Sequence, residues 1–270
     1  MNDLQQFQRL IKDYYANNQR CFPWREQITP YCIVVSEIML QQTQTDRVVQ
    51  KFDTFVKKFP TFNALAAASF HEVLLLWKGL GYNRRAMALQ NTARRVVEEF
   101  HGILPTEPEI LESFPGIGPA TARSIVAFAF NQPTVFIETN IRTVFIHFFF
   151  NNRTNISDKE IEPLVAQTVD KSNPREWYYA LMDYGVMLKK SIGNVSRLSK
   201  HYHKQSPFKG SERQLRGLIL QYLLEYPDGL GELELVTLVG RDEKLVGKVI
   251  TDLQNECFIS YEKNMWRIGS

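Results

Sequence analysis

Apolar residues recur every three or four positions along most of this 270-residue chain, in short segments separated by Pro and Gly. This spacing predicts amphipathic helices. The alternation typical of strands is confined to the last fifteen residues. The predicted helices are 4–17, 31–42, 45–58, 63–68, 70–77, 83–100, 107–113, 119–130, 140–150, 158–169 and 174–188. We therefore expect an all-α protein through residue 188.

A change in composition marks a second domain. Residues 189–216 hold eight Lys and Arg, two His and one acid, Glu212. A linker is expected at 205–210, because its Pro and Gly disfavour regular structure. Helices at 211–225, 231–239 and 242–256, then strands at 257–261 and 264–268, predict a small winged-helix-like domain. Such a domain binds DNA or RNA, or serves in docking. The predicted domains are thus 1–204 and 211–270.

Composition excludes several classes of protein. With 44% hydrophobic and 23% charged residues, the chain is expected to fold. Cys21, Cys32 and Cys257 are an odd, widely spaced set, so we expect neither a disulfide framework nor a metal centre built from four cysteines. No stretch has the length of a membrane span, and the amphipathic start does not resemble a signal peptide. We expect a protein that is not secreted and has no membrane partner.

A tight glycine turn lies between two predicted helices, within 111–125. Its sequence, FPGIGPATA at 114–122, is that of a helix-hairpin-helix turn. Gly116 and Gly118 allow positive φ and close backbone approach, and the next helix N-terminus can hold a DNA phosphate. An ordinary corner between two helices is the alternative.

Two carboxylates are candidates for chemistry. Glu37 sits in the apolar helix that contains CIVVSEIML, and burial there would raise its pKa and make it a general acid. The alternative is an exposed glutamate. Glu138 ends the short apolar run FIE just before a helix, so it is either a favourable charge at the helix N-terminus or the second acid of a pair.

Taken together, these motifs resemble the helix-hairpin-helix DNA glycosylases, specifically the MutY-type adenine DNA glycosylases. The resemblance covers about residues 4–188. It rests on FPWR at 22–25, SEIMLQQTQ at 36–44, Trp77 with GLGYNRRA at 79–86, the turn from Phe114, and ALMDYG at 180–185. It implies a two-lobed, all-α glycosylase fold.

The resemblance also implies roles for individual residues. Glu37 would protonate the adenine to expel it, and Glu138 would stabilise the sugar cation. Gln42 would insert into the DNA stack, with Tyr82 as a wedge beside the orphan base. The base pocket would include Trp24, Arg25 and Ala120. The DNA-binding residues would be Gln41, Gln42, Gln44, Tyr82, Arg84, Gly116, Gly118, Ala120, Thr121, Lys189 and Lys190.

Three features depart from the family pattern. Glu138 stands where the family has Asp, and its carboxylate is one methylene further from the backbone. Ala120 replaces the usual Ser or Tyr, and related lyases carry a Schiff-base Lys there. The four-cysteine iron–sulfur loop is replaced by a cysteine-free segment, 186–209. We therefore expect no lyase lysine, no iron–sulfur cluster and no other metal site, except for a monovalent cation at the hairpin turn.

The expected function is monofunctional glycosylase activity in base excision repair, on a damaged or mispaired base in double-stranded DNA. Adenine in a mismatch is the favoured base. Excision of a different damaged base, or a catalytically weak DNA-binding protein on the same fold, are the alternatives. We expect a monomer that is cytoplasmic and nucleoid-associated, or nuclear.

The basic segment generates a first prediction. Neutralising Lys189, Lys190, Arg197 and Lys200 together should weaken DNA binding and flatten its dependence on salt, because fewer counterions are released. Titrating a labelled duplex at several salt concentrations measures both effects. An unchanged slope would refute the assignment of this segment to DNA.

Overall fold

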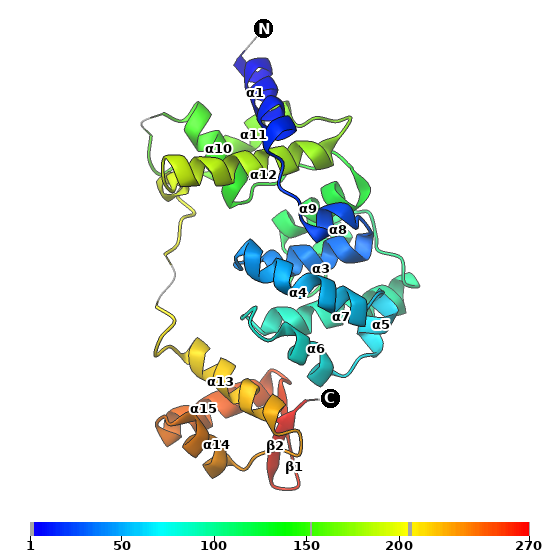
Figure 1. Cartoon of the computed structure of the whole chain (residues 1–270), viewed down its shortest axis with the longest axis vertical. Coiled ribbons are helices and arrows are strands. Elements are labelled where there is room, and N and C mark those ends of the chain that lie inside the picture. Colours follow the sequence, from blue (N-terminus) through cyan, green and yellow to red (C-terminus); the bar gives the residue numbers. More distant parts are fainter. Residues whose placement is uncertain (1–2, 152, 205–206, 270) are drawn as a thin grey trace. The chain divides into compact units, whose positions relative to one another are not determined.

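A computed structural model describes residues 3–151, 153–204 and 207–269 (Figure 1). In these residues the chain is mostly helical, with a two-stranded antiparallel hairpin near the C-terminus. The predicted fold class is confirmed. None of the described helices is long and apolar enough to cross a membrane.

The helices divide into two compact units, 1–37 with 104–204, and 38–103 with 205–270. The first unit contains α1 (Asp3–Asn18), α2 (Pro23–Glu26), most of α3 (Pro30–Leu40), α8 (Pro108–Glu112), α9 (Pro119–Phe130), α10 (Thr139–Phe149), α11 (Asp158–Thr168), α12 (Pro174–Ser191) and the 3-10 helix η1 (Val195–Leu198). The second contains α4 (Thr45–Lys58), α5 (Phe62–Ala67), α6 (Phe70–Trp77), α7 (Arg84–Phe100), α13 (Glu212–Glu225), α14 (Glu232–Val239), α15 (Glu243–Asn255), β1 (Ile259–Glu262) and β2 (Met265–Ile268).

Local sequence signals explain most helix ends. Ser69 and Ser157 form capping boxes at the starts of α6 and α11, and Pro119 occupies the first turn of α9. Two short elements, α2 and η1, were not predicted. Each is only four residues long, so neither has a full apolar period to reveal it.

The C-terminal elements follow the predicted winged-helix order. The first strand begins at Ile259, two residues later than predicted, because Cys257 has φ 61° and its amide still bonds to Gln254 at the end of α15. The hairpin turns at Lys263 and Asn264, both with positive φ, as two-residue hairpins require. The predicted linker, 205–210, starts with two residues that lie outside the described ones.

Residues 211–269 pack against the rest of the second unit. Phe258 contacts Phe70 of α6 with ring centroids 5.6 Å apart, and Lys78 pairs with Glu225 of α13 at 3.0 Å. The C-terminal elements are therefore joined to α6 by both apolar and ionic contacts.

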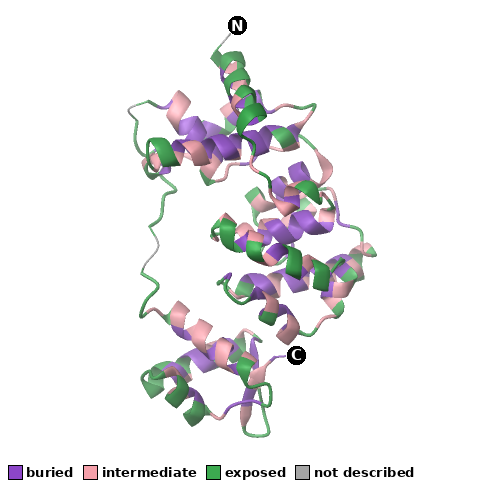
Figure 2. Ribbon diagram, viewed as in Figure 1, coloured by how far each residue is buried: buried purple, intermediate pink, exposed green. Residues whose placement is uncertain are grey.

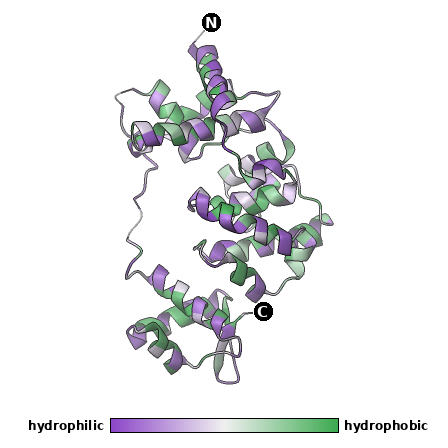
Figure 3. Cartoon of the chain, viewed as in Figure 1, coloured by the Kyte–Doolittle hydropathy of each residue, from purple (hydrophilic) through white to green (hydrophobic). Residues whose placement is uncertain are grey.

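Burial follows hydropathy along the helices (Figures 2 and 3). On α3, Ile33, Val34, Val35, Ile38 and Met39 are all at most 1% exposed. On the amphipathic α4, by contrast, a buried apolar face alternates with an exposed polar one. Because α3 has so little polar surface, any charged side chain on it is forced among apolar neighbours.

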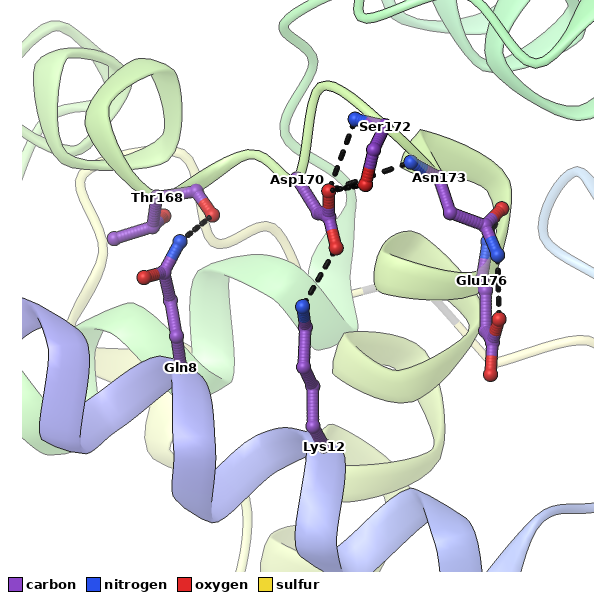
Figure 4. A network of polar contacts seen from close by, with 7 residues as sticks. All are labelled: Gln8, Lys12, Thr168, Asp170, Ser172, Asn173 and Glu176. Carbon is purple, nitrogen blue, oxygen red and sulfur yellow. Dashed lines mark hydrogen bonds and ion pairs between the residues drawn. The ribbon is translucent and has the colours of Figure 1, made fainter.

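The loop between α11 and α12 holds α1 in place (Figure 4). Lys12 donates to Asp170 at 2.6 Å, and Gln8 donates to the carbonyl of Thr168 at 2.7 Å. Asp170 also accepts from the amide and hydroxyl of Ser172. The ammonium of Lys12 and the bonds from Ser172 hold the pKa of Asp170 well below its usual range.

A buried carboxylate joins α12 to the segment around α2. Asp183 is 2% exposed and accepts two bonds at 2.9 Å from the guanidinium of Arg25. It also accepts from Arg20, through the side chain at 2.7 Å and the backbone amide at 2.9 Å. The charge is thus fully paired, which a buried carboxylate requires.

Asp183→Asn should lower the free energy of unfolding by about 3 kcal/mol or more, because it breaks a buried pair and leaves Arg25 without a counter-charge. Urea unfolding of the mutant and the wild type measures the loss. Asp13→Asn, in the exposed pair with Arg9, is the control and should change stability by about 1 kcal/mol at most. Equal effects of the two substitutions would contradict this account.

Candidate active site

Glu37 is held on α3 among buried apolar side chains. Protein atoms surround its carboxyl, although part of the side chain stays open to solvent. Burial and, to a smaller extent, the neighbouring Glu138 raise its pKa to about 7, against the lowering effect of a hydrogen bond from Ser124. This direction agrees with the one predicted from the sequence, and with such a pKa Glu37 can carry a proton at neutral pH.

Ser124 of α9 bonds to the Glu37 carboxyl through its hydroxyl. The same hydroxyl oxygen lies 3.0 Å from the carbonyl of Thr121. A serine hydroxyl has one proton and two acceptor positions. With Glu37 protonated, Ser124 can accept from the carboxyl and donate to Thr121 at once. When Glu37 is ionised, the same hydroxyl donates to the carboxylate instead, so Ser124 can serve both states of the acid. Nothing in the sequence pattern indicates Ser124.

Glu138 caps the N-terminus of α10. One carboxylate oxygen accepts from the amides of Asn140 at 2.6 Å and Ile141 at 2.9 Å, and the other accepts from the Asn140 side chain at 3.2 Å. Burial raises its pKa, while these bonds and the charges of Lys189 and Arg142 act to lower it. Glu138 is therefore both the N-terminal charge and a neighbour of Glu37.

The two carboxyls have contrasting surroundings. Glu37 has a neutral hydroxyl as hydrogen-bond partner, whereas Glu138 has two backbone amides, an amide side chain and nearby cations. Amides at a helix N-terminus favour the ionised form of a carboxylate. Burial leaves the pKa of both carboxyls raised, but the amides and cations favour the ionised form at Glu138 more than at Glu37. Such a contrast suits the division of roles used to break glycosidic bonds, in which one carboxyl is the acid and the other a carboxylate.

Aromatic side chains lie near this pair. Tyr179 of α12 has its ring stacked on Phe128 at 4.8 Å and covered by the guanidinium of Arg25 at 4.3 Å. Its hydroxyl is buried without a hydrogen-bond partner among the described residues. Burial raises the pKa of Tyr179, and the charge of Glu37 adds to this. Tyr179 was not predicted, since it lies within a continuous apolar pattern.

The predicted base-pocket residues lie in different settings. Arg25 is buried and bound to Asp183, and Trp24 is buried with its ring stacked on Phe22 at 5.0 Å. Ala120 lies exposed in the first turn of α9. Whether these three residues line one pocket stays a prediction.

The hairpin turn has a buried side and an exposed side. Phe114 and Ile117 are 3% and 4% exposed, while Gly118 and the first turn of α9 face solvent. Gly116 has φ 73°, which explains glycine there. Gly118 has φ −91°, so the prediction of positive φ holds for Gly116 only. A Cβ on Gly118 would meet no protein atom within 4 Å, so the space beside this glycine is open to an approaching ligand.

Two turns of the second unit carry most of the other predicted DNA contacts. Gln42 is exposed with φ 54°, and Tyr82 is 37% exposed with φ 48°. Tyr82 accepts a bond from Arg213 of α13 at 3.2 Å, and Arg84 forms a double hydrogen bond with Glu256. Gln41 is partly buried and Gln44 precedes α4.

Arg85 fixes both of these turns. Its guanidinium donates to the carbonyls of Ile38 and Met39 at the end of α3, each at 2.8 Å. It also donates to the hydroxyl of Thr43 at 2.8 Å and the carbonyl of Gly81 at 3.1 Å. One buried side chain therefore holds the segment of Gln42 and the segment of Tyr82 in place. Its pKa is lowered to about 10 by burial.

The two lysines of the basic segment differ. Lys190 is exposed, whereas Lys189 is partly buried and donates to the side chain of Asn140 at 2.6 Å. Arg197 and Lys200 are exposed and available to a charged partner.

The residues present do not fit the iron–sulfur cluster of the resembling family. Segment 186–209 has no cysteine, Cys32 is buried within α3, and Cys257 belongs to the second unit. Among the described residues there is also no group of three or more His, Cys, Asp or Glu suited to a metal ion. The monovalent cation at the hairpin turn stays a prediction.

A family model described as HhH-GPD superfamily base excision DNA repair protein matches residues 35–171, which include Glu37, the hairpin turn and Glu138. The chain belongs to this superfamily. An adenine DNA glycosylase of Buchnera aphidicola is 33% identical over 192 residues, covering 70% of this chain and 54% of that protein. One of Rattus norvegicus is 34% identical, covering 68% of this chain and 38% of the relative.

Among solved structures, a thermostable thymine-DNA glycosylase superposes with a TM-score of 0.62 at 25% identity, covering 72% of this chain and 94% of that one. The resemblance to MutY-type glycosylases within the HhH-GPD superfamily is confirmed by the curated relatives. The chain spans about half or less of the length of the two relatives described.

The raised pKa of Glu37 predicts how stability depends on pH. The unfolded carboxyl loses its proton near pH 4.5, and the folded one only near pH 7. The contribution of Glu37 to stability is therefore full below pH 4.5 and is lost as the pH rises through 7. Glu37→Gln, which cannot ionise, should be more stable than wild type by about 3 kcal/mol at pH 8, and this gain should vanish near pH 4.

Urea unfolding of both proteins between pH 4 and pH 8.5 measures this difference. Glu98→Gln, at an exposed position on α7, is the matched control and should show no such trend. A difference between Glu37→Gln and wild type that does not vary with pH would contradict the assigned shift.

Proposed function

We propose that this chain is a monofunctional DNA glycosylase that hydrolyses the bond between a mispaired or damaged base and its sugar, most readily at adenine in a mismatch. The observation that carries the proposal is the neighbouring pair of Glu37 and Glu138, in which Glu37 is bonded to a neutral hydroxyl and Glu138 to two backbone amides. The names of the curated relatives support adenine as the base.

In the proposed reaction Glu37 transfers a proton and Glu138 stabilises the sugar cation. Glu37 gives its proton to a ring nitrogen of the base, and the base takes the electron pair of the glycosidic bond as it leaves. The sugar becomes an oxocarbenium ion, which the carboxylate of Glu138 stabilises. Water then adds to the sugar carbon and its proton returns to Glu37. The products are a free base and a sugar hydroxyl, and the enzyme ends unchanged.

Double-stranded DNA is the proposed partner. The exposed N-terminus of α9 would hold a phosphate through backbone amides. Gln42, on a turn fixed by Arg85, would insert into the DNA stack, and Tyr82, on the other turn that Arg85 fixes, would be the wedge beside the orphan base. We propose that the protein acts as a monomer without a metal cofactor, in the compartment that contains the DNA.

A hydrolytic reaction without strand cleavage is proposed because Ala120 occupies the position where related lyases carry their lysine. Schiff-base formation needs an amine at the reacting sugar carbon. Lys189, the partly buried lysine of the basic segment, is bound to Asn140.

A second candidate is excision of a different base. Ala120 and Glu138 both depart from the family pattern, and the chain is similar to a thymine-DNA glycosylase at 25% identity. A DNA-binding protein with weak or no catalysis is the remaining alternative.

The proposal predicts that Glu37→Gln loses base release by about a hundredfold or more, since general acid catalysis contributes at least that much. DNA affinity should stay within about threefold, because Glu37 meets the base rather than the phosphates. The measurement is single-turnover release from duplexes with adenine opposite 8-oxoguanine or guanine, thymine opposite guanine, and 3-methyladenine. Alkali converts released sites to strand breaks.

Glu98→Gln serves again as the control and should release the base at the wild-type rate. Release from the thymine or 3-methyladenine duplex alone would contradict adenine as the base but would still agree with glycosylase activity. Binding without release from any duplex would favour the DNA-binding alternative. Strand breaks before alkali, or trapping by borohydride, would contradict the monofunctional reaction.

A further inference from the structure

A lysine of α12 reaches the N-terminus of α10 beside Glu138. Lys189 donates to the side-chain oxygen of Asn140 at 2.6 Å. The amide nitrogen of the same Asn140 side chain donates to Glu138 at 3.2 Å, and its backbone amide donates to Glu138 at 2.6 Å. Lys189, Asn140 and Glu138 thus form a continuous chain of hydrogen bonds that ends on the proposed catalytic carboxylate.

The backbone of α12 is shaped for this contact. Gly185 lies one turn before Lys189, so both are on the same face of the helix. A Cβ on Gly185 would lie 2.6 Å from the carbonyl oxygen of Asn140 and 2.8 Å from its Cβ. Glycine therefore lets α10 approach closely, and Lys189 can then reach the Asn140 side chain.

Lys189 also selects the orientation of the Asn140 amide. An ammonium group can only donate, so it must face the amide oxygen. The NH₂ group is then directed to Glu138, where it can only donate to a carboxylate oxygen. Lys189 and the Glu138 carboxylate therefore favour the same orientation of the amide, and without Lys189 the amide oxygen would lose its charged donor.

Several other charges face Glu138. Arg142 lies one turn along α10, but it is doubly bonded to Asp158 of α11. Glu37 contributes a second acid from α3. The charge of Lys189 lowers the pKa of Glu138, and burial lowers the pKa of Lys189 itself. Lys189 is thus the cation that α12 supplies to this carboxylate.

We propose that Lys189 is a positioning residue for Glu138, which orients Asn140 and keeps the carboxylate ionised, rather than a residue that contacts DNA phosphates. The inference rests on the proposed function, in which ionised Glu138 stabilises the sugar cation. It assigns Lys189 a role different from that of the exposed lysine next to it, Lys190.

Lys189→Met should slow single-turnover base release at saturating enzyme by about tenfold at neutral pH. The rate requires Glu138 ionised and Glu37 protonated, so it rises and then falls with pH. Loss of the lysine charge raises the pKa of Glu138, so the rising limb should move to higher pH by about one unit, a tenfold change in the ionised fraction on that limb. Lys189→Arg, which keeps the charge, should recover part of the rate.

Two other substitutions distinguish a positioning role of Lys189 from a contact with DNA phosphates. Lys190→Met should weaken DNA affinity and reduce its salt dependence, as loss of a phosphate contact does. Lys159→Met, at an exposed position on α11, is the neutral control. If Lys189→Met behaves like Lys190→Met, with weaker binding but an unchanged rate at saturation, the inference is overturned.

A double-mutant cycle of Lys189→Met and Glu138→Gln, measured by urea unfolding, tests the contact without any activity. Losing Lys189 should lower the unfolding midpoint less when Glu138 is already Gln. Additive shifts would overturn the inference. If the wild type released no base from any duplex, the proposed function would fail, and this cycle would still decide whether Lys189 stabilises Glu138.

Discussion

The structure depends on the burial of one carboxyl, that of Glu37, in the apolar helix α3. A charged group there is costly because its hydrogen-bond partner is the neutral hydroxyl of Ser124 and a second carboxyl stands nearby. The cost is avoided when Glu37 keeps its proton. The same condition makes it a proton donor at neutral pH, so the constraint on folding and the capacity for acid catalysis have a single origin.

The second carboxyl is stabilised in the opposite state by backbone geometry. Glu138 accepts two amides at the N-terminus of α10, and α12 approaches that terminus closely because position 185 is glycine. Its ionised form then raises the pKa of Glu37. Each carboxyl therefore favours the state that the other needs, and the arrangement requires α3, α9, α10 and α12 to pack together in one unit.

Much of this could be predicted from the sequence. Pro, Gly and Ser fix most helix ends locally, and Glu37 stands out as a lone acid in an apolar helix. Ser124 and the reach of Arg85 could not be predicted, because they depend on partners distant in sequence. Because a run of basic residues does not reveal that one of them bonds to Asn140, the sequence pattern predicts that Lys189 contacts DNA. Its spacing of four from Gly185 is the signal that could have indicated it.

Backbone hydrogen bonds hold the segment that follows α12. Ile156 accepts from the amide of Lys200 at 2.9 Å and donates to the carbonyl of Leu198 at 3.1 Å. Ser196, within η1, is 3% exposed. These bonds return the segment to the start of α11, so it stays packed against α10 without cysteine ligands. Both α12 and η1 therefore pack against α10, the helix whose N-terminus Glu138 caps.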